Sequence, residues 1–326
     1  MRTFRSGHFK VNGLTLRTNG SGKLILAIVV SLSFIPIIYI INNVLFGVGY
    51  SDMVTLDDDY IAEWAADDPR LIKHIRDHYL EPPSPREVSY NLEYPNKRDY
   101  SHKMQSKIVE NILGSKRDGF FVECGAYDGE TYSNSLSFEK YLDWTGVLIE
   151  PDHANLKRLR AKNRKSWIVR GCLEGNDKPK KMLLYGAMDI GTLGQYMTPV
   201  RNIFTRIWRP TKTTNVWCFP LYSILLAVNH TKVDYFSLDV EGAEMSILKA
   251  LPFDKIDIDV LQVEFMVFQG VYWDKDLSNQ RKEELRHFMK KNLPQYKENK
   301  IVFLDIIYVK DRENEISAAE NSLNFI

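Results

Sequence analysis

A glycine-containing turn carries the first residues whose types and spacing could support chemistry. The apolar stretch 120–124 predicts a strand, and it runs into ECGAYDG, which supplies Glu123, Gly125, Asp128 and Gly129 before a helical pattern begins. A doubly wound sheet binds the polar end of a ligand at such a strand-to-helix turn. Glycine lets the backbone approach a ligand closely, but any tight connection also favours it. The turn alone therefore leaves a purely structural interpretation open.

An acid at the end of the next predicted strand narrows the choice of ligand. Glu150 closes the stretch GVLIEP, where a carboxylate can accept hydrogen bonds from two ribose hydroxyls. The glycine spacing, G-x-x-x-G, differs from the G-x-G-x-x-G of dinucleotide sites, and the acids Glu123 and Asp128 would repel a pyrophosphate. Acids suit a ligand with a cationic sulfonium and an ammonium group. The pattern therefore favours S-adenosylmethionine over a dinucleotide.

Alternating strand and helix patterns must position these residues. Apolar runs of strand length are separated by segments with helical periodicity, which is typical of an α/β fold with βαβ connections. Continuous apolar strands indicate a doubly wound, mostly parallel sheet covered on both faces, for which we expect seven strands. The predicted strands are 120–124, 146–151, 166–172, 181–186, 233–240, 257–265 and 301–309, and the predicted helices are 61–80, 103–115, 133–144, 153–163, 220–228, 243–251 and 278–292.

A hydrophobic segment near the N-terminus predicts one transmembrane helix. In residues 24–41, 15 of 18 side chains are apolar and none is charged, about the minimum for a span. A buried helix of a soluble protein and a cleaved signal peptide are the alternatives. The basic segment before the run is long for a signal peptide, and the sequence after it offers a poor cleavage site. An uncleaved anchor fits better.

The flanking charges predict the topology. Basic residues precede the span without an acid, and acidic residues follow it, which keeps the N-terminus in the cytosol. We expect a type II membrane protein of the secretory pathway, in the endoplasmic reticulum or Golgi, with the endosome or plasma membrane as further locations. The expected parts are a basic cytosolic tail over 1–23, a signal anchor over 24–46, an acidic, proline-containing stem over 47–101 and a luminal domain over 102–326.

The motifs together resemble the FkbM family of S-adenosylmethionine-dependent methyltransferases. The similarity covers residues 105–270 and rests on FFVECGAYDGETYSNSLSFEKYLDWTGVLIEPD and VDYFSLDVEGAEMSILKAL. It implies a Rossmann-like methyltransferase sheet that binds S-adenosylmethionine. The turn would then line the methionine end of the cofactor, Glu150 would hold the ribose, and Cys172 would lie near the adenine. The cofactor-binding residues implied are Glu123, Gly125, Asp128, Gly129, Asn134, Glu150, Cys172 and Asp239.

Three further acids are candidates for the substrate side of the site. Asp239 ends a predicted strand that should face the first turn, and Glu241, Glu244 and Glu264 lie close to the ends of neighbouring strands. A buried carboxylate with a raised pKa could act as general base for a hydroxyl. The alternative is that Glu241 caps the next helix and Glu244 complements its dipole. Both interpretations stay open.

Composition excludes some classes of function. A formal net charge of +1 gives no field for nucleic acid. Three cysteines, Cys124, Cys172 and Cys218, are too few and scattered for a disulfide framework or a zinc site, so we expect no metal, at most one bridge and a free thiol near the crevice. The luminal sequon at Asn229 is a candidate for glycosylation.

Two hypotheses about function follow. The first is an O-methyltransferase that acts on a glycan or another hydroxyl acceptor in the secretory pathway, with S-adenosylmethionine as cofactor. The second rests on the anchor and stem, which resemble those of Star-like animal membrane proteins concerned with export of epidermal growth factor receptor ligands. In that case the domain binds growth-factor precursors or other membrane cargo, and the fold serves as a binding module. The sequence leaves the oligomeric state open.

Overall fold

The computed structural model describes residues 8–11, 14–17, 59–185, 192–193, 213–269 and 272–312. The chain divides into two compact units, Met1–Asp57 and Asp58–Ile326. In the first unit, β1 (His8–Val11) and β2 (Leu14–Arg17) pair as an antiparallel hairpin. The predicted membrane anchor, 24–46, lies outside the described residues. Within the part of the chain that is described, no helix combines the length and the apolar composition needed to span a bilayer.

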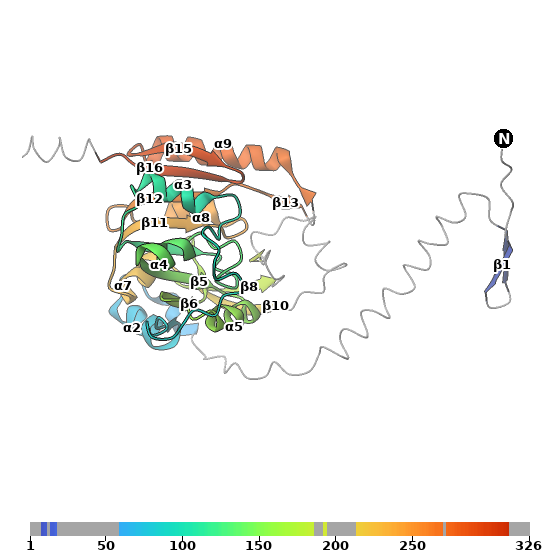
Figure 1. The fold of residues 1–326 in the computed structure, drawn as a ribbon, viewed down its shortest axis with the longest axis horizontal. Coiled ribbons are helices and arrows are strands. Elements are labelled where there is room, and N and C mark those ends of the chain that lie inside the picture. Colours follow the sequence, from blue (N-terminus) through green and yellow to red (C-terminus); the bar gives the residue numbers. More distant parts are fainter. Residues whose placement is uncertain are drawn as a thin grey trace, which may run out of the picture. The chain divides into compact units, whose positions relative to one another are not determined.

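The second unit is built on an eight-stranded sheet, shown in Figure 1. Its strand order is β15-β16-β12-β11-β4-β5-β6-β3. The five central strands are parallel and almost wholly buried, which explains their continuous apolar sequences. They are β4 (Phe120–Cys124), β5 (Thr145–Glu150), β6 (Trp167–Arg170), β11 (Lys232–Leu238) and β12 (Asp257–Glu264). The predicted α/β fold is confirmed.

The edges of the sheet differ from the prediction of seven mostly parallel strands. The predicted final strand, 301–309, is wrong, because the chain reverses inside it at Phe303, whose φ is +57°. The result is a hairpin of β15 (Tyr296–Val302) and β16 (Asp305–Lys310), in which β16 runs antiparallel to both β15 and β12. At the other edge, β3 (Leu80–Glu81) pairs antiparallel with β6. The sheet is therefore mixed and has eight strands.

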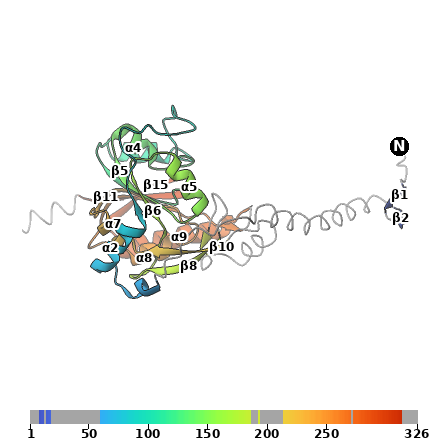
Figure 2. The same cartoon turned by 90° about the horizontal axis from the view of Figure 1, so that it is seen from below.

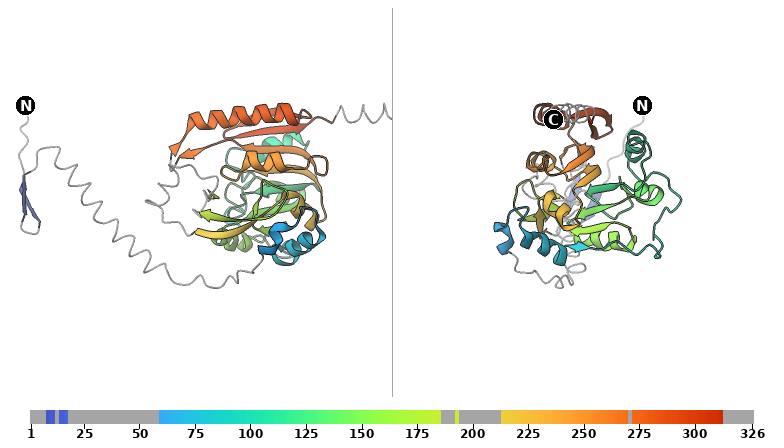
Figure 3. Two further views of the ribbon diagram at one scale, coloured as in Figure 1. Left: turned by 180° about the vertical axis from the view of Figure 1, so that it is seen from behind. Right: turned by 90° about the vertical axis from the view of Figure 1, so that its left-hand side faces the viewer.

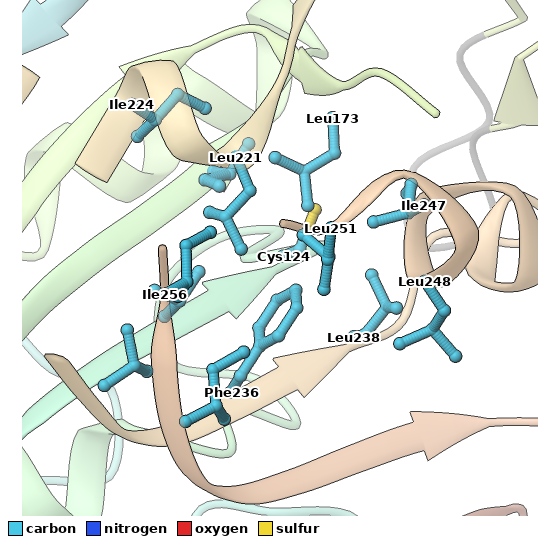
Figure 4. Close-up of a cluster of buried hydrophobic side chains, with 14 of the residues drawn as sticks. Cys124, Leu173, Leu221, Ile224, Phe236, Leu238, Ile247, Leu248, Leu251 and Ile256 are labelled. Carbon is cyan, nitrogen blue, oxygen red and sulfur yellow. The ribbon is translucent and has the colours of Figure 1, made fainter. Parts of the chain in front are cut away.

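Helices cover both faces of this sheet, as Figure 2 shows. On β4, the alternating residues Phe120, Val122 and Cys124 join one apolar cluster, and Phe121 joins the other. The first cluster, part of which Figure 4 shows, includes side chains of α2 (Pro69–His78), α7 (Leu221–Ala227), α8 (Glu244–Ala250) and α9 (Lys275–Asn292). The second includes side chains of α3 (Gln105–Ile112), α4 (Leu136–Leu142) and α5 (His153–Ala161). Figure 3 shows α9 lying along the β15–β16 hairpin.

Residues 59–101, predicted as part of a stem, are folded into the second unit. They form the short helix η1 (Asp59–Glu63), then α2 and β3. Ile61, Leu71 and Ile75 are fully buried in the core, because apolar residues recur on one face of these helices. The predicted helix over 61–80 is not continuous, because a new helix, α2, starts within it. Asp68 caps the N-terminus of α2, and Pro69 is its first residue. The domain thus begins well before residue 102.

A second, four-stranded sheet follows β6 along the chain. Its order is β7-β10-β8-β9, with β7 (Cys172–Leu173), β10 (Thr213–Phe219), β8 (Lys180–Tyr185) and β9 (Thr192–Leu193). Cys172 and Cys218 lie opposite each other on parallel strands and form a disulfide. The prediction of at most one bridge and a free thiol is therefore confirmed, and the free, buried cysteine is Cys124 at the end of β4. A two-stranded ribbon of β13 (Phe268–Gln269) and β14 (Tyr272–Trp273) precedes α9.

Candidate active site

The carboxyl ends of the parallel strands gather the predicted site residues. The chain runs from β4 outward to β5 and β6, then returns to the opposite side of β4 with β11 and β12. The direction of winding therefore reverses between β4 and β11. Ligands of doubly wound sheets bind in the crevice at this reversal. Glu123 and Glu150 lie at the ends of β4 and β5, and Asp239 and Glu264 at the ends of β11 and β12.

Gly125 is required by the close approach of two strand ends. Its φ is +86°, and a Cβ added there would lie 2.2 Å from the carbonyl oxygen of Asp239. Gly129 is also left-handed, at +79°, and a Cβ there would lie 2.3 Å from Cδ1 of Leu159. Any side chain would strain both positions. The structural interpretation of the two glycines thus holds, and at Gly125 the space that a side chain would occupy is filled by the Asp239 carbonyl oxygen.

Glu123 holds the turn that leads into α4. Its carboxylate accepts hydrogen bonds from Ser133 Oγ at 3.0 Å, from the Asn134 amide at 2.6 Å and from Ser135 Oγ. Burial raises the pKa of Glu123, and the positive charge of Arg164 opposes that rise. Since three of the roughly four acceptor positions of the carboxylate are occupied, contact with a methionine end stays a prediction.

Asn134 links that turn to β11 and keeps one atom unsatisfied. Its Nδ2 donates to Ser237 Oγ at 3.0 Å. Its Oδ1 is buried, and the described residues offer it no hydrogen-bond partner. A buried carbonyl oxygen without a donor is costly, and an ammonium or hydroxyl group of a ligand would satisfy it. This orphaned acceptor is one observation in favour of a polar ligand at the predicted cofactor site.

Asp128 and Glu150 accept hydrogen bonds that stabilise the turns after β4 and β5. Asp128 accepts hydrogen bonds from the backbone of Glu130 and Thr131, at 2.9 and 2.7 Å, and from the Thr131 hydroxyl. Glu150 accepts from the backbone of Tyr127 at 2.8 Å, and its other contacts are the Asp152 amide and Asn155 Nδ2. Burial raises the pKa of Glu150 to about 7. About one acceptor position of Glu150 is left for a ribose hydroxyl, so the predicted bond to both hydroxyls stays a prediction.

Three carboxylates meet where β11 and β12 end. Oxygens of Asp239, Glu241 and Glu264 all lie within 4.8 Å of one another. Burial, and then the neighbouring negative charges, raise the pKa of Asp239 and of Glu264 well above the usual range. Because like charges this close repel each other, ionisation of one carboxyl group disfavours ionisation of the other. The cluster can attract a cationic group or hold a metal ion, for which carboxylate oxygens are suitable ligands. The sequence predicted no metal.

Glu244 does not share this arrangement. Its carboxylate accepts hydrogen bonds from the amides of Val240 and Gly242, each at 3.1 Å, and lies 3.6 Å from Nη1 of Arg281. It is the first residue of α8, and its side chain accepts these amide hydrogen bonds just before the helix. These contacts match the structural alternative for Glu244, whereas Glu241, whose φ is +58°, lies in the cluster.

Cys172 and Asn229 lie apart from the carboxylates. The sulfur of Cys172 is bonded to that of Cys218 in the second sheet, so it offers no thiol to a ligand, and its contact with an adenine stays a prediction. Asn229 is exposed just after α7, where the chain turns into the amino end of β11. It therefore lies at the edge of the sheet opposite the site, where its predicted glycosylation would not cover the crevice.

Sequence reasoning missed Arg164, which connects the turns. Arg164 is fully buried, pairs with Glu139 at 3.1 Å, and donates to the Gly129 carbonyl and to Ser135 Oγ. It follows an exposed helix in a run of polar residues, so nothing in the local pattern marks it as buried. The acid at position 139 inside an otherwise apolar helix face is the one available signal, because a buried acid needs a partner.

Residues 123–297, more than half of the chain, match the family described as the methyltransferase FkbM domain. The chain therefore belongs to the FkbM methyltransferase family. The matched range includes every carboxylate of the site.

Remote similarity to solved structures accompanies this match. The methyltransferase FkbM from Methylobacillus flagellatus is 15% identical, with a TM-score of 0.34, over 59% of this chain and 43% of that one. A putative S-adenosyl-L-methionine-dependent methyltransferase from Methanococcus maripaludis is 13% identical, with a TM-score of 0.28, over 64% of this chain and 85% of that one. This chain thus spans less than half the length of the first structure. No curated protein matches it.

Proposed function

We propose that this protein is an S-adenosylmethionine-dependent methyltransferase that methylates a hydroxyl group of a glycan or a similar acceptor. The observation that carries the proposal is the convergence of Asp239, Glu241 and Glu264 at the winding reversal of an FkbM domain. A cationic sulfonium and an ammonium group fit these acids and the orphaned oxygen of Asn134.

The residues of the chain would supply positioning and a proton acceptor. Bound cofactor supplies an activated methyl group. Because the pKa values of Asp239 and Glu264 are raised, an ionised carboxylate of this cluster would be a stronger base than an ordinary one and would accept a proton from an acceptor hydroxyl. Glu150 would orient the ribose, and holding the hydroxyl in line with the methyl group would provide most of the acceleration.

Calorimetric titration with S-adenosylmethionine and its demethylated product tests the cofactor site. The protein should span residues 58–326, since the compact unit begins at Asp58 and includes α2 and β3. Micromolar binding should be lost in Asp239→Asn and weakened in Glu150→Ala. The matched control is Asp259→Asn, an acid on β12 that pairs with Arg312 away from the cluster and should bind normally. Absence of S-adenosylmethionine binding to the folded protein would refute the proposal.

The proposal includes a type II anchor and a luminal domain. Its support is the uncharged segment 24–41 between basic and acidic flanks. Expression in secretory cells tests this part: treatment with an endoglycosidase should shift the mass of the protein, and Asn229→Gln should abolish the shift. A domain that a protease digests in sealed microsomes would instead lie on the cytosolic side.

A Star-like trafficking role is the second candidate, and one observation favours it. The carboxylates of Glu123 and Asp128 are both engaged in hydrogen bonds within their own turns, as a binding module without a cofactor would need. In this case the domain would recognise membrane cargo such as growth-factor precursors. Normal cargo export by a variant such as Asp239→Asn, which has lost cofactor binding, would favour trafficking over methyl transfer.

A further inference from the structure

Three residues, His102, Tyr132 and Phe303, form an exposed cluster of aromatic side chains at the same edge of the sheet as the carboxylates. The His102 ring lies 4.5 Å from that of Tyr132 and 5.1 Å from that of Phe303, measured between centroids. Three segments that are far apart in sequence contribute to this cluster, which we call the ring platform: the segment before α3, the turn after β4 and the β15–β16 turn.

The backbone of the ring platform is unfavourable for the residues it carries. Tyr132 and Phe303 have φ values of +59° and +57°, in the left-handed region that large side chains avoid. The two residues are nevertheless 52% and 49% exposed. Glycine would relieve the backbone at both positions, and neither side chain is fully buried in compensation. Backbone strain at an exposed aromatic residue is typical of a functional surface.

Residues next to the ring platform connect it to the edge of the sheet that carries the carboxylates. Gln105, three residues after His102, donates from Nε2 to Oδ2 of Asp305 at 2.9 Å. Asp305 is paired in register with Glu264, a member of the cluster. On the other side, Ser101 forms a β-bridge with Tyr132, and the two residues that follow Tyr132 bond to Glu123. The platform and the reacting end of the site are therefore parts of one edge.

From this we infer that the ring platform binds the apolar face of a neutral sugar ring in the acceptor, an inference that rests on the proposed function. Exposed aromatic faces carry negative charge that attracts the polarised C–H bonds on one face of a sugar. The adjacent carboxylates can accept hydrogen bonds from its hydroxyls. Burial and the charge of Lys103 lower the pKa of His102, and the Lys103 ammonium lies over the Phe303 ring, 5.2 Å from its centroid. An anionic membrane surface would be repelled by the nearby acids.

Saturation-transfer NMR on the full-length protein tests this inference. The probes are neutral methyl glycosides of glucose, galactose, mannose, fucose, xylose and N-acetylglucosamine. At least one should receive saturation on one face of its ring, and Tyr132→Gly and Phe303→Gly should each weaken its binding at least tenfold. Both variants should melt at the same or a higher temperature, because glycine relieves the backbone. The matched control is Tyr60→Ala, which removes an equally exposed tyrosine that packs on His74.

Several outcomes would overturn the ring platform as a sugar site. They are binding of no glycoside, binding unchanged by the glycine variants, a lower melting temperature in those variants, and capture by phosphatidylserine vesicles that depends on Tyr132 and Phe303. Titration with S-adenosylmethionine is run in parallel. Glycoside binding without cofactor binding would refute the methyltransferase proposal and leave the sugar site standing, and the reverse result would refute only the sugar site.

Discussion

Replacement of Arg164 by methionine should lower the stability of the domain severely. The guanidinium is fully buried, and its removal breaks the ion pair with Glu139 and the hydrogen bonds to the Gly129 carbonyl and Ser135 Oγ. Removing one partner of a buried ion pair costs about 3–5 kcal/mol, because the other charge is left without compensation. At about 2–4 °C per kcal/mol for a large domain, the melting temperature should fall by about 6–20 °C.

Thermal and urea unfolding at pH 7 measure this loss. The matched control is Arg160→Met, which removes an arginine that pairs with Glu81 and whose side chain is 36% exposed, so it should cost less than about 1 kcal/mol. Adding Glu139→Gln to the Arg164 variant should recover part of the stability, since the uncompensated charge is then gone. A loss below about 1 kcal/mol for Arg164→Met would refute the reasoning that this pair anchors the turns.

Three further predictions concern the site and its surroundings. Gly125→Ala should abolish cofactor binding in calorimetry, because the methyl group would lie 2.2 Å from the Asp239 carbonyl oxygen, and unchanged affinity would contradict the close approach. Cys172→Ser opens a bridge between residues 46 apart and should destabilise the oxidised protein by about 4 kcal/mol in urea, whereas the variant and reduced wild type should unfold alike. Burial raises the pKa of Glu150 to about 7 in the folded protein. The favourable contribution of this shift to the free energy of unfolding is therefore complete below about pH 4.5 and is lost as the pH rises through 7. Between pH 5 and pH 8, Glu150→Gln should therefore gain up to about 3 kcal/mol relative to wild type, and a constant difference would contradict the raised pKa.

Local patterns were sufficient to predict the centre of the fold. The strands 120–124 and 257–265 are buried on both faces, so their sequences are continuously apolar and agree with β4 and β12 to within one residue. Helix α8 likewise follows its predicted span closely. Each of four predicted strands ends at or next to an acid: Glu123, Glu150, Asp239 or Glu264. Because parallel strands run in the same direction, this was enough to place the four acids at one edge of the sheet.

Features that depend on distant contacts could not be predicted in this way. The reversal at Phe303 has no glycine, proline or asparagine to mark it, so the hairpin appeared to be one strand. The segment before residue 102 looked like a stem because β3 has only two residues and depends on its pairing with β6. The meeting of Glu241 with Asp239 and Glu264 depends on a left-handed residue in a turn, which sequence periodicity does not reveal.

The bond between Cys172 and Cys218 makes the stability of this domain depend on the compartment in which it folds. Disulfides form and persist in the oxidising lumen of the secretory pathway, whereas the cytosol keeps thiols reduced. Copies that fold in a reducing compartment would therefore carry two free thiols in strands β7 and β10 and would unfold more readily. Cellular quality control could then remove such copies on stability alone, without recognising any address in the sequence.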